Sequence, residues 1–500
     1  MSTLLIENAN ELVTPEGRHA LNGHAMAKLR VIPNGALLSE NGVITAVGTT
    51  EDVRRQLRQR QSDCSTSHKL NFESNCQSDR SSSYKSSFES NCSSSHELSC
   101  ESNLPSGHPT SGKLSCGSDF SSDRSSSRQL DLRSDDVIIR DDAITRIDAT
   151  GKTVLPGFVD PHTHFVFGGY REDEFNLRLQ GASYMDIMRM GGGIAATNRA
   201  THAASEEELY AEGFKRMDRM LDLGITTVEG KTGYGEDTAT EDKMLRVMEL
   251  LDRDHPVDVV KTYLGAHAVP PSWKGRSGEY IDYLIKEGLP MAAGRAEFCD
   301  VFTEEGVFSL EESEKLLRAA KEQGFKLKMH ADEIEPMGGA GLAAKLGAVS
   351  ADHLLKAKDE DLFAMRDAGC IACVLPLTAF SLREPYARAR FMIEHGLAVA
   401  LGTDLNPGSC YSQSIPLMIA LATIYMKLTI EETITAITLN AAAAIDRADR
   451  IGSLERGKAA DVVILDCPGY RHLSYHFAMN LVDTVIKNGD VVRRPCDRNC

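Results

Sequence analysis

The stretch VLPGFVDPHTH, residues 154–164, joins an apolar run to two histidines that are one residue apart. The apolar run, Val154–Val159, predicts a buried strand, and side chains two positions apart on a strand point the same way. His162 and His164 are therefore expected to face one side where the strand ends. Two imidazoles placed in this way can bind one metal ion, or they can be ordinary histidines. The rest of the chain has to distinguish these possibilities.

The run at 154–159 is the first of eight apolar runs that alternate with amphipathic helices between residues 154 and 444. The helical stretch 309–324 has a capping box at Ser309 and Glu312 and a C-terminal stop at Gly324. Eight strand–helix units predict an α/β fold with a (β/α)8 TIM-type barrel. The other seven predicted strands are Thr226–Glu229, Val257–Leu264, Glu297–Phe302, Phe325–Met329, Val349–Asp352, Ile371–Leu375 and Leu397–Leu401.

The segments that flank the barrel alternate apolar and polar residues, and they predict a small β-sandwich domain built from both chain ends. Its parts are expected at 1–58, with a hairpin turn at Asn41-Gly42, at 136–153 and at 445–500. Between the first two parts, residues 59–135 are rich in Ser and repeat imperfectly, as in SFESNCSSS. Such a composition buries too little apolar surface to offset chain entropy, so a disordered, low-complexity insertion is predicted.

The composition excludes several classes of function. A formal net charge of -17 and a pI near 5.4 argue against nucleic acid or an anionic membrane as the main partner. A small anionic substrate stays possible, because a few local arginines can attract it. No apolar run approaches the ~18 residues of a membrane helix, and the N-terminal stretch lacks the pattern of a secretory signal. With twelve cysteines in a chain this long, a reducing cytoplasm is expected.

Ionisable residues gather at the ends of the predicted barrel strands, where the active sites of such barrels lie. Imidazoles with a carboxylate form a good ligand set for Zn²⁺ or Fe and leave positions open for water. A single histidine at a strand end is more often hydrogen-bonded or exposed, but several converging on one rim indicate a metal site. The residues in question are His162, His164, His330, Glu333, His353 and Asp404.

Several motifs together resemble the amidohydrolase superfamily of metal-dependent hydrolases: VLPGFVDPHTH, KMHADE (328–333), ADH (351–353), GTDLNPG (402–408) and GSLERGKAADVVILD (452–466). Within it, the imidazolonepropionase family of histidine degradation is the most similar. That similarity includes Arg171 in HFVFGGYREDEF, Tyr234 in KTGYG, His267 in YLGAHAVPP, and the stretch FSLRE (380–384). The resemblance covers most of residues 1–58 and 136–495. The Ser-rich segment departs from it, because the family has only a short connection there.

The resemblance implies a set of roles for individual residues. One Zn²⁺ or Fe ion would be held by His162, His164, His330 and Asp404. The catalytic residues would be Glu333, His353 and Asp404. The substrate would be bound by Arg171, Tyr234, His267, Asn406, Gly408 and Ser409. The implied reaction is hydrolysis of the cyclic amide C–N bond of 4-imidazolone-5-propanoate to N-formimidoyl-L-glutamate, and a homodimer is implied as well.

Elementary chemistry agrees with this reaction. A cyclic amide resists neutral water, whereas a metal lowers the pKa of bound water to about 7 and so supplies hydroxide. His353 and His267 could stabilise the oxyanion that forms on the ring carbonyl. Asp404 or Glu333 could carry a proton to the leaving nitrogen, and the sequence leaves open which one does. Arg171 suits the propanoate carboxylate, because a guanidinium binds a carboxylate with two parallel hydrogen bonds.

One metal ion rather than two is expected. Dinuclear relatives carry a bridging lysine near the exit of the fourth strand, and CDVFTEEG (299–306) contains none; Lys231 and Lys261 lie on other strands. Two alternatives to the imidazolone reaction remain. A purine- or pyrimidine-type deaminase would share the metal ligands but would need no carboxylate-binding Arg171. A non-enzymatic binding protein on this fold would usually lack some of the ligands, and all are present here.

Overall fold

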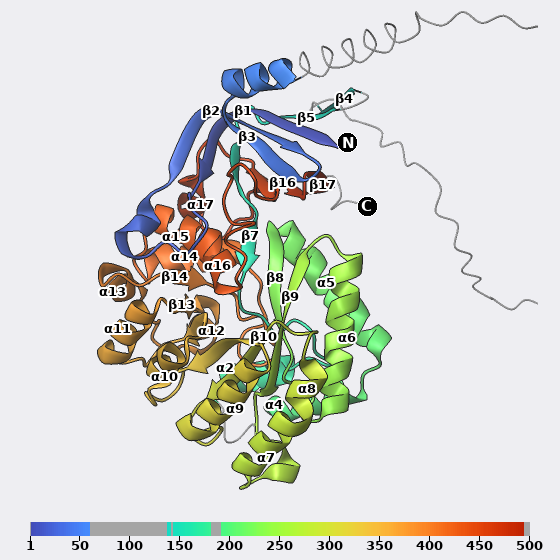
Figure 1. Cartoon of the computed structure of the whole chain (residues 1–500), viewed down its shortest axis with the longest axis vertical. Helices are drawn as coiled ribbons and strands as arrows, with labels where there is room; N and C mark the ends of the chain where they lie inside the picture. The colour runs from blue at the N-terminus through green and yellow to red at the C-terminus, as the bar shows by residue number, and fades with distance from the viewer. Residues whose placement is uncertain (1, 61–137, 142–143, 182–191, 495–500) are drawn as a thin grey trace, which may run out of the picture. The chain divides into compact units, whose positions relative to one another are not determined.

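The computed structural model of the protein describes residues 2–60, 138–141, 144–181 and 192–494. The chain divides into two compact units, one of residues 1–57 and 137–500 and the other of residues 58–136. The predicted disordered insertion, 59–135, lies outside the described residues except for its first two positions. All strands among the described residues belong to the first unit (Figure 1). No helix in the described part of the chain is long and apolar enough to cross a membrane.

The predicted barrel is confirmed. Eight parallel strands follow one another in chain order, and each of the eight predicted runs overlaps one of them. They are β7 (Phe158–Asp160), β8 (Ile225–Lys231), β9 (Asp258–Ala266), β10 (Phe298–Thr303), β11 (Lys326–Ala331), β12 (Ser350–His353), β13 (Ile371–Val374) and β14 (Val399–Leu401). The ends of β14 and β7 are connected in two ways. Thr163 and Leu405 form a β-bridge. The carboxylate of Asp160 accepts hydrogen bonds from the Thr403 amide (3.0 Å) and hydroxyl (2.5 Å).

The prediction of a single strand at 154–159 is wrong. The run forms two strands in different sheets, β6 (Thr153–Pro156) and β7, which are separated at Gly157. A Cβ atom at Gly157 would lie 2.3 Å from the Thr226 hydroxyl, so only glycine fits where the chain passes from one sheet to the other. Every residue of the run is buried, and no polar position marks the break. Hydrophobic periodicity alone therefore could not reveal it.

Both chain ends contribute strands to the small β domain, as the sequence predicts, and these strands form one nine-stranded mixed sheet beside the barrel where a β-sandwich was expected. Figure 1 shows the first strands (blue) together with β16 and β17 (red). The Asn41-Gly42 turn is also confirmed, because both residues have positive φ, 50° and 80°, between paired strands. The strands are β1 (Thr3–Thr14), β2 (Arg30–Glu40), β3 (Val43–Thr49), β4 (Ile138–Asp141), β5 (Ile144–Asp148), β6, β15 (Val462–Leu465), β16 (Val482–Lys487) and β17 (Asp490–Arg493).

Helices connect the barrel strands and cover them from outside. The helix predicted at 309–324 is α9 (Leu310–Glu322), and its capping box is present: Ser309 Oγ accepts from the Glu312 amide (3.2 Å), and the Glu312 carboxylate accepts from the Ser309 amide (2.9 Å). Residues 50–60 are also helical. Further helices are η1 (Gly23–Ala27), α2 (Glu172–Leu179), α4 (Ile194–Ala203), α5 (Glu206–Asp222), α6 (Thr238–Asp254), η2 (Pro271–Trp273), α7 (Ser277–Tyr283), η3 (Leu284–Gly288), α8 (Leu289–Ala292), α10 (Gly339–Leu346), α11 (Asp359–Ala368), α12 (Pro376–Leu382), α13 (Ala389–Glu394), α14 (Ile415–Ile424), α15 (Ile430–Ile437), α16 (Leu439–Ala444) and α17 (His472–Tyr475).

Candidate active site

A cavity of about 250 Å³ opens at the carboxyl ends of the barrel strands. Eleven of the twelve predicted site residues line it. The twelfth, His162, is fully buried, and the centre of its ring lies 4.6 Å from that of His330 and 5.3 Å from those of His164 and His353. The structure thus brings together residues from loops that are up to 247 positions apart in the chain, from His162 to Ser409. The lining residues predicted from the sequence are His164, Arg171, Tyr234, His267, His330, Glu333, His353, Asp404, Asn406, Gly408 and Ser409.

Potential ligand atoms of His162, His164 and Asp404 lie within 4.8 Å of one another, and His330 groups in the same way with His162 and His353 and with His164 and His267. Asp404 Oδ1 lies 3.5 Å from His162 Nε2 and 3.6 Å from His164 Nε2, and His330 Nε2 lies 3.4 Å from His164 Nε2. A tetrahedral Zn²⁺ with its ligands about 2.1 Å away places neighbouring ligand atoms about 3.4 Å apart. These three separations are close to those between neighbouring ligands of one such ion.

The protonation states also suit a metal. Burial, with neighbouring positive groups adding to it, holds the pKa of His162 and of His164 well below the usual range, so both rings are neutral. A neutral imidazole can offer a nitrogen lone pair to a metal. Within the described residues, the buried Nε2 atom of His162 has no hydrogen-bond partner. A bound ion would satisfy that atom.

A hydrogen bond to one of its two carboxylate oxygens holds Asp404 in place. Thr378 Oγ1 donates a hydrogen bond of 2.6 Å to Asp404 Oδ2, which leaves Oδ1 to face the two histidines. Burial raises the pKa of Asp404 to about 6, against the opposing effect of the Thr378 hydrogen bond. Its backbone is left-handed, with φ of 52°, and so is that of His353, with φ of 75°. Such conformations cost non-glycine residues roughly 1–3 kcal/mol and often occur at functional sites.

Glu333 and His353 form a pair in the lining of the cavity, with His353 Nδ1 3.5 Å from Glu333 Oε1. Burial, reinforced by the nearby carboxylates of Asp404 and Glu304, raises the pKa of Glu333 to about 8. The carboxyl group of Glu333 is therefore mostly protonated at neutral pH. Glu304 fixes the following backbone, because its carboxylate accepts hydrogen bonds from the amides of Ile334 (2.9 Å) and Glu335 (3.1 Å).

Tyr234 and His267 form the wall beside His164. The His164 and His267 rings stack with centres 4.9 Å apart, and the centre of the Tyr234 ring lies 5.3 Å from that of His267. The loop that carries Tyr234 is anchored by Glu241, whose buried carboxylate accepts hydrogen bonds from the Gly233 and Gly235 amides. Burial lowers the pKa of His267 to about 3, so its ring is neutral and can take part in hydrogen bonds within the cavity.

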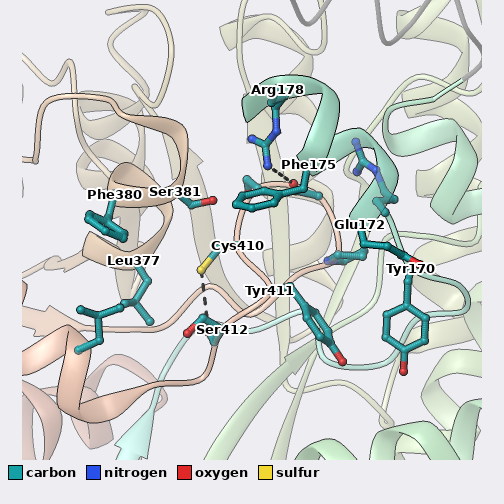
Figure 2. A pocket seen from close by; sticks show the side chains of 15 residues that line it. Tyr170, Glu172, Phe175, Arg178, Leu377, Phe380, Ser381, Cys410, Tyr411 and Ser412 are labelled. Atoms are coloured by element: carbon teal, nitrogen blue, oxygen red, sulfur yellow. Dashed lines mark hydrogen bonds between the residues drawn. The ribbon is translucent and has the colours of Figure 1, made fainter. Parts of the chain in front are cut away.

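Two arginines lie at one end of the cavity. Arg171 is held by Glu174, with Nε and Nη2 2.8 and 2.7 Å from Glu174 Oε2. A Cβ atom at position 408 would lie 2.2 Å from Arg171 Nη1, so Gly408 provides the space in which this guanidinium lies. Arg178, which the sequence did not single out, donates a hydrogen bond of 3.0 Å to the Gly408 carbonyl, drawn as a dashed line in Figure 2. A positively charged corner is thereby formed in a chain of strongly negative net charge.

A second cavity of about 530 Å³ adjoins the first, since Arg171, Arg178, Gly408 and Ser409 line both. Figure 2 shows its aromatic and apolar side chains, among them Phe175, Phe380 and Tyr411. The loop between the two cavities is shaped by Asn406, whose side-chain oxygen accepts hydrogen bonds of 2.8 Å from the amides of Gly408 and Ser409. Asn406 therefore shapes the Gly408–Ser409 turn on which both arginines lie.

Comparison with known proteins agrees with this geometry. Residues 153–492 match the model of the Amidohydrolase family. The chain is 60% identical over 348 residues to a protein of Clostridium tetani named imidazolonepropionase, which covers 69% of this chain and 83% of that one. It is 48% identical over 494 residues to the imidazolonepropionase of Parabacteroides distasonis, which covers 98% and 99% of the two chains.

Solved structures support the fold. The guanine deaminase of E. coli superposes with a TM-score of 0.61 over 99% of both chains, at 14% sequence identity. Identity this low shows a shared fold and says nothing about a shared substrate. The relatives of high identity carry the imidazolonepropionase name, so the deaminase alternative is not favoured. The chain belongs to the amidohydrolase family and, within it, to the imidazolonepropionases.

Proposed function

We propose that this protein hydrolyses the cyclic amide C–N bond of 4-imidazolone-5-propanoate to give N-formimidoyl-L-glutamate. The observation that carries the proposal is the arrangement of one cavity: a donor set with separations of 3.4–3.6 Å at one end and Arg171 with Arg178 at the other. The first group suits a hydrolytic metal, and the second suits a carboxylate tail. Relatives that are 48–60% identical carry the name of the enzyme for this reaction.

His162, His164, His330 and Asp404 would hold one Zn²⁺ or Fe ion. Such an ion, when bound, lowers the pKa of a coordinated water and polarises a carbonyl oxygen. A single ion is supported by the surroundings of the fourth strand, where Asp300 rather than a lysine is found. The ammonium group of Lys231 lies 2.7 Å from that carboxylate and already supplies a positive charge there.

Within this proposal, Glu333 transfers a proton to the leaving ring nitrogen. Its carboxyl group faces the cavity with His353 as its neighbour, and its pKa of about 8 suits a group that both accepts and donates a proton near neutral pH. Asp404 is less free to do so, because one oxygen faces the histidines and the other accepts from Thr378. Glu333 would thus protonate the leaving ring nitrogen, while neutral His353 and His267 would donate hydrogen bonds to the carbonyl oxygen as charge develops on it.

The other lining residues would orient the substrate. Arg171 would bind the propanoate carboxylate, and Tyr234 would contact the ring. The turn formed by Asn406, Gly408 and Ser409 would contact the product at its other end. A neutral purine or pyrimidine offers no carboxylate for Arg171. The direct test is to incubate the purified protein with 4-imidazolone-5-propanoate or with guanine and to follow the ultraviolet absorbance of each ring. Loss of the imidazolone absorbance alone is expected, and turnover of guanine alone would contradict the proposal.

Removal of residues 59–135, with a short Gly/Ser linker in their place, should leave kcat and KM within about twofold of the full chain. The catalytic residues and all barrel strands lie outside this segment, and changing the length of a loop alters its closure entropy only slightly. Steady-state kinetics of both forms provide the measurement. A tenfold fall in kcat with an unchanged melting temperature would mean that the segment contributes to the active site.

We also propose, from composition and family resemblance, that the enzyme is a cytoplasmic homodimer.

A further inference from the structure

The barrel interior next to the metal ligands contains several charged side chains with no exposed surface, and ion pairs join five of them. They come from four strands, β8, β10, β11 and β12, with two of them on β8. Such interiors are usually filled by branched apolar side chains, and burying charges is costly unless each one is paired. The cost of burying these charges indicates that they serve a function. The five residues, called here the barrel charge network, are Glu229, Lys231, Asp300, Lys328 and Asp352.

Two carboxylates of the barrel charge network contact metal ligands from behind. Asp352 Oδ2 lies 2.6 Å from His162 Nδ1, and Asp300 Oδ2 lies 2.9 Å from His330 Nδ1. An ionised carboxylate in this position keeps the proton on Nδ1 and fixes the ring orientation, so that the Nε2 lone pair is directed at the donor set. The contact between Asp352 and His162 is a hydrogen bond, whereas that between Asp300 and His330 is an ion-pair contact. Among the described residues, His330 Nδ1 and His164 Nδ1 both lack a hydrogen-bond partner, so His162 has the firmest support.

The lysines connect these carboxylates to each other. Lys231 Nζ lies 2.7 Å from Asp300 Oδ2 and 3.6 Å from Asp352 Oδ2, so one ammonium group bridges the supports of both histidines. Glu229 joins the two lysines, at 3.0 Å from Lys231 and 2.8 Å from Lys328. Lys328 also donates a hydrogen bond of 2.8 Å to the carbonyl of Pro161, the residue before His162.

The charges of the barrel charge network do not cancel, because three carboxylates and two ammonium groups leave one net negative charge. The carboxylate of Asp404 adds negative charge beside the histidines. A bound cation would offset this excess. By contrast, Lys458 is also fully buried but donates to the backbone carbonyls of Gly17, Ala448 and Ile451 near the mixed sheet. Lys458 thus has the role of a purely structural buried lysine and offers a matched control.

We propose that Lys231 is a positioning residue for the metal centre: by bridging Asp300 and Asp352 it holds His330 and His162 in the orientation that binds the ion. This proposal rests on the metal site proposed above and not on the identity of its substrate. Lys231 touches neither the cavity nor the donor atoms. Its loss should therefore weaken metal binding without removing a ligand.

The test measures zinc affinity, by competition with a chromogenic chelator, for the wild-type protein and for three variants. Lys231→Met and the nearly isosteric Asp352→Asn should each raise the Kd for Zn²⁺ by about 10- to 100-fold, as is typical when a group that supports a ligand is lost. Lys458→Met should lower the melting temperature of the protein while leaving the Kd within about twofold. Circular dichroism establishes that each variant is folded before its affinity is measured.

Wild-type zinc affinity in folded Lys231→Met and Asp352→Asn would overturn the proposal. So would an equal loss of affinity in Lys458→Met, because the effect would then reflect general destabilisation. If Lys231→Met does not fold, Lys231→Gln takes its place in the comparison with Lys458→Met. The readout is independent of turnover, so failure to hydrolyse 4-imidazolone-5-propanoate would count against the proposed substrate and not against this inference.

Discussion

Replacing Asp404 with Asn should lower kcat by about a thousandfold and leave the purified protein with well under one metal ion per chain. The substitution keeps the shape of the side chain but removes the charge of the oxygen that faces both His162 and His164 at 3.5–3.6 Å. A metal contributes several kcal/mol to stabilisation of the transition state, and each 1.4 kcal/mol corresponds to about a tenfold change in rate. Steady-state kinetics and elemental analysis on the same preparation measure both effects.

Asp466→Asn is the control for this change, because Asp466 is an exposed aspartate that follows β15 of the mixed sheet. It should retain wild-type rate and metal content. An Asp404→Asn protein that keeps its metal and at least a tenth of its kcat would show that Asp404 is neither a ligand nor a catalytic group.

Replacing Arg171 with Ala should lower kcat/KM for 4-imidazolone-5-propanoate by about 100-fold, mainly through KM. Hydrogen bonds to a charged group contribute roughly 1.5–3 kcal/mol, and the lost pair would bind the carboxylate in both the ground state and the transition state. The kcat/KM of Arg171→Lys should lie between those of the wild type and Arg171→Ala, because an ammonium group keeps the charge but not the two parallel donors. Initial rates over a range of substrate concentrations separate KM from kcat.

Arg318→Ala, which removes an exposed arginine of α9 paired with Glu314, should behave as the wild type. If Arg171→Ala retains full activity, the positively charged corner does not bind the substrate. The assignment of a propanoate substrate would then lose its structural basis, although the metal centre would not.

The sequence predicts the barrel well because eight apolar runs and their helices obey a simple periodicity. It fails at Gly157, because a continuously buried run carries no mark of the passage from one sheet to another. The boundaries of later strands are close to those predicted; β11, for example, runs to Ala331 rather than Met329. Local pattern thus specifies which elements exist, whereas tertiary packing sets where they end.

The candidate site was predicted largely from motifs, and the structure brings all of the motif residues together. The supporting groups were not assigned a role, although Lys328 and Asp352 lie within the KMHADE and ADH motifs. Asp300, Asp352 and Lys328 appear in the sequence as charged residues within otherwise apolar strands, and this was a usable signal, because a buried charge requires a partner. Arg178 gives no such signal, because it lies on a helix rich in charged residues. Only the tertiary fold brings its side chain to the cavity.

The central claim is that His162, His164, His330 and Asp404 bind one metal ion on which hydrolysis depends. The most direct test is elemental analysis of the active protein before and after exhaustive dialysis against a chelator, with turnover measured on both samples. One equivalent of zinc or iron per chain, loss of turnover with loss of the metal, and recovery when the metal is restored are predicted. Undiminished turnover in a protein that contains no transition metal would contradict the account.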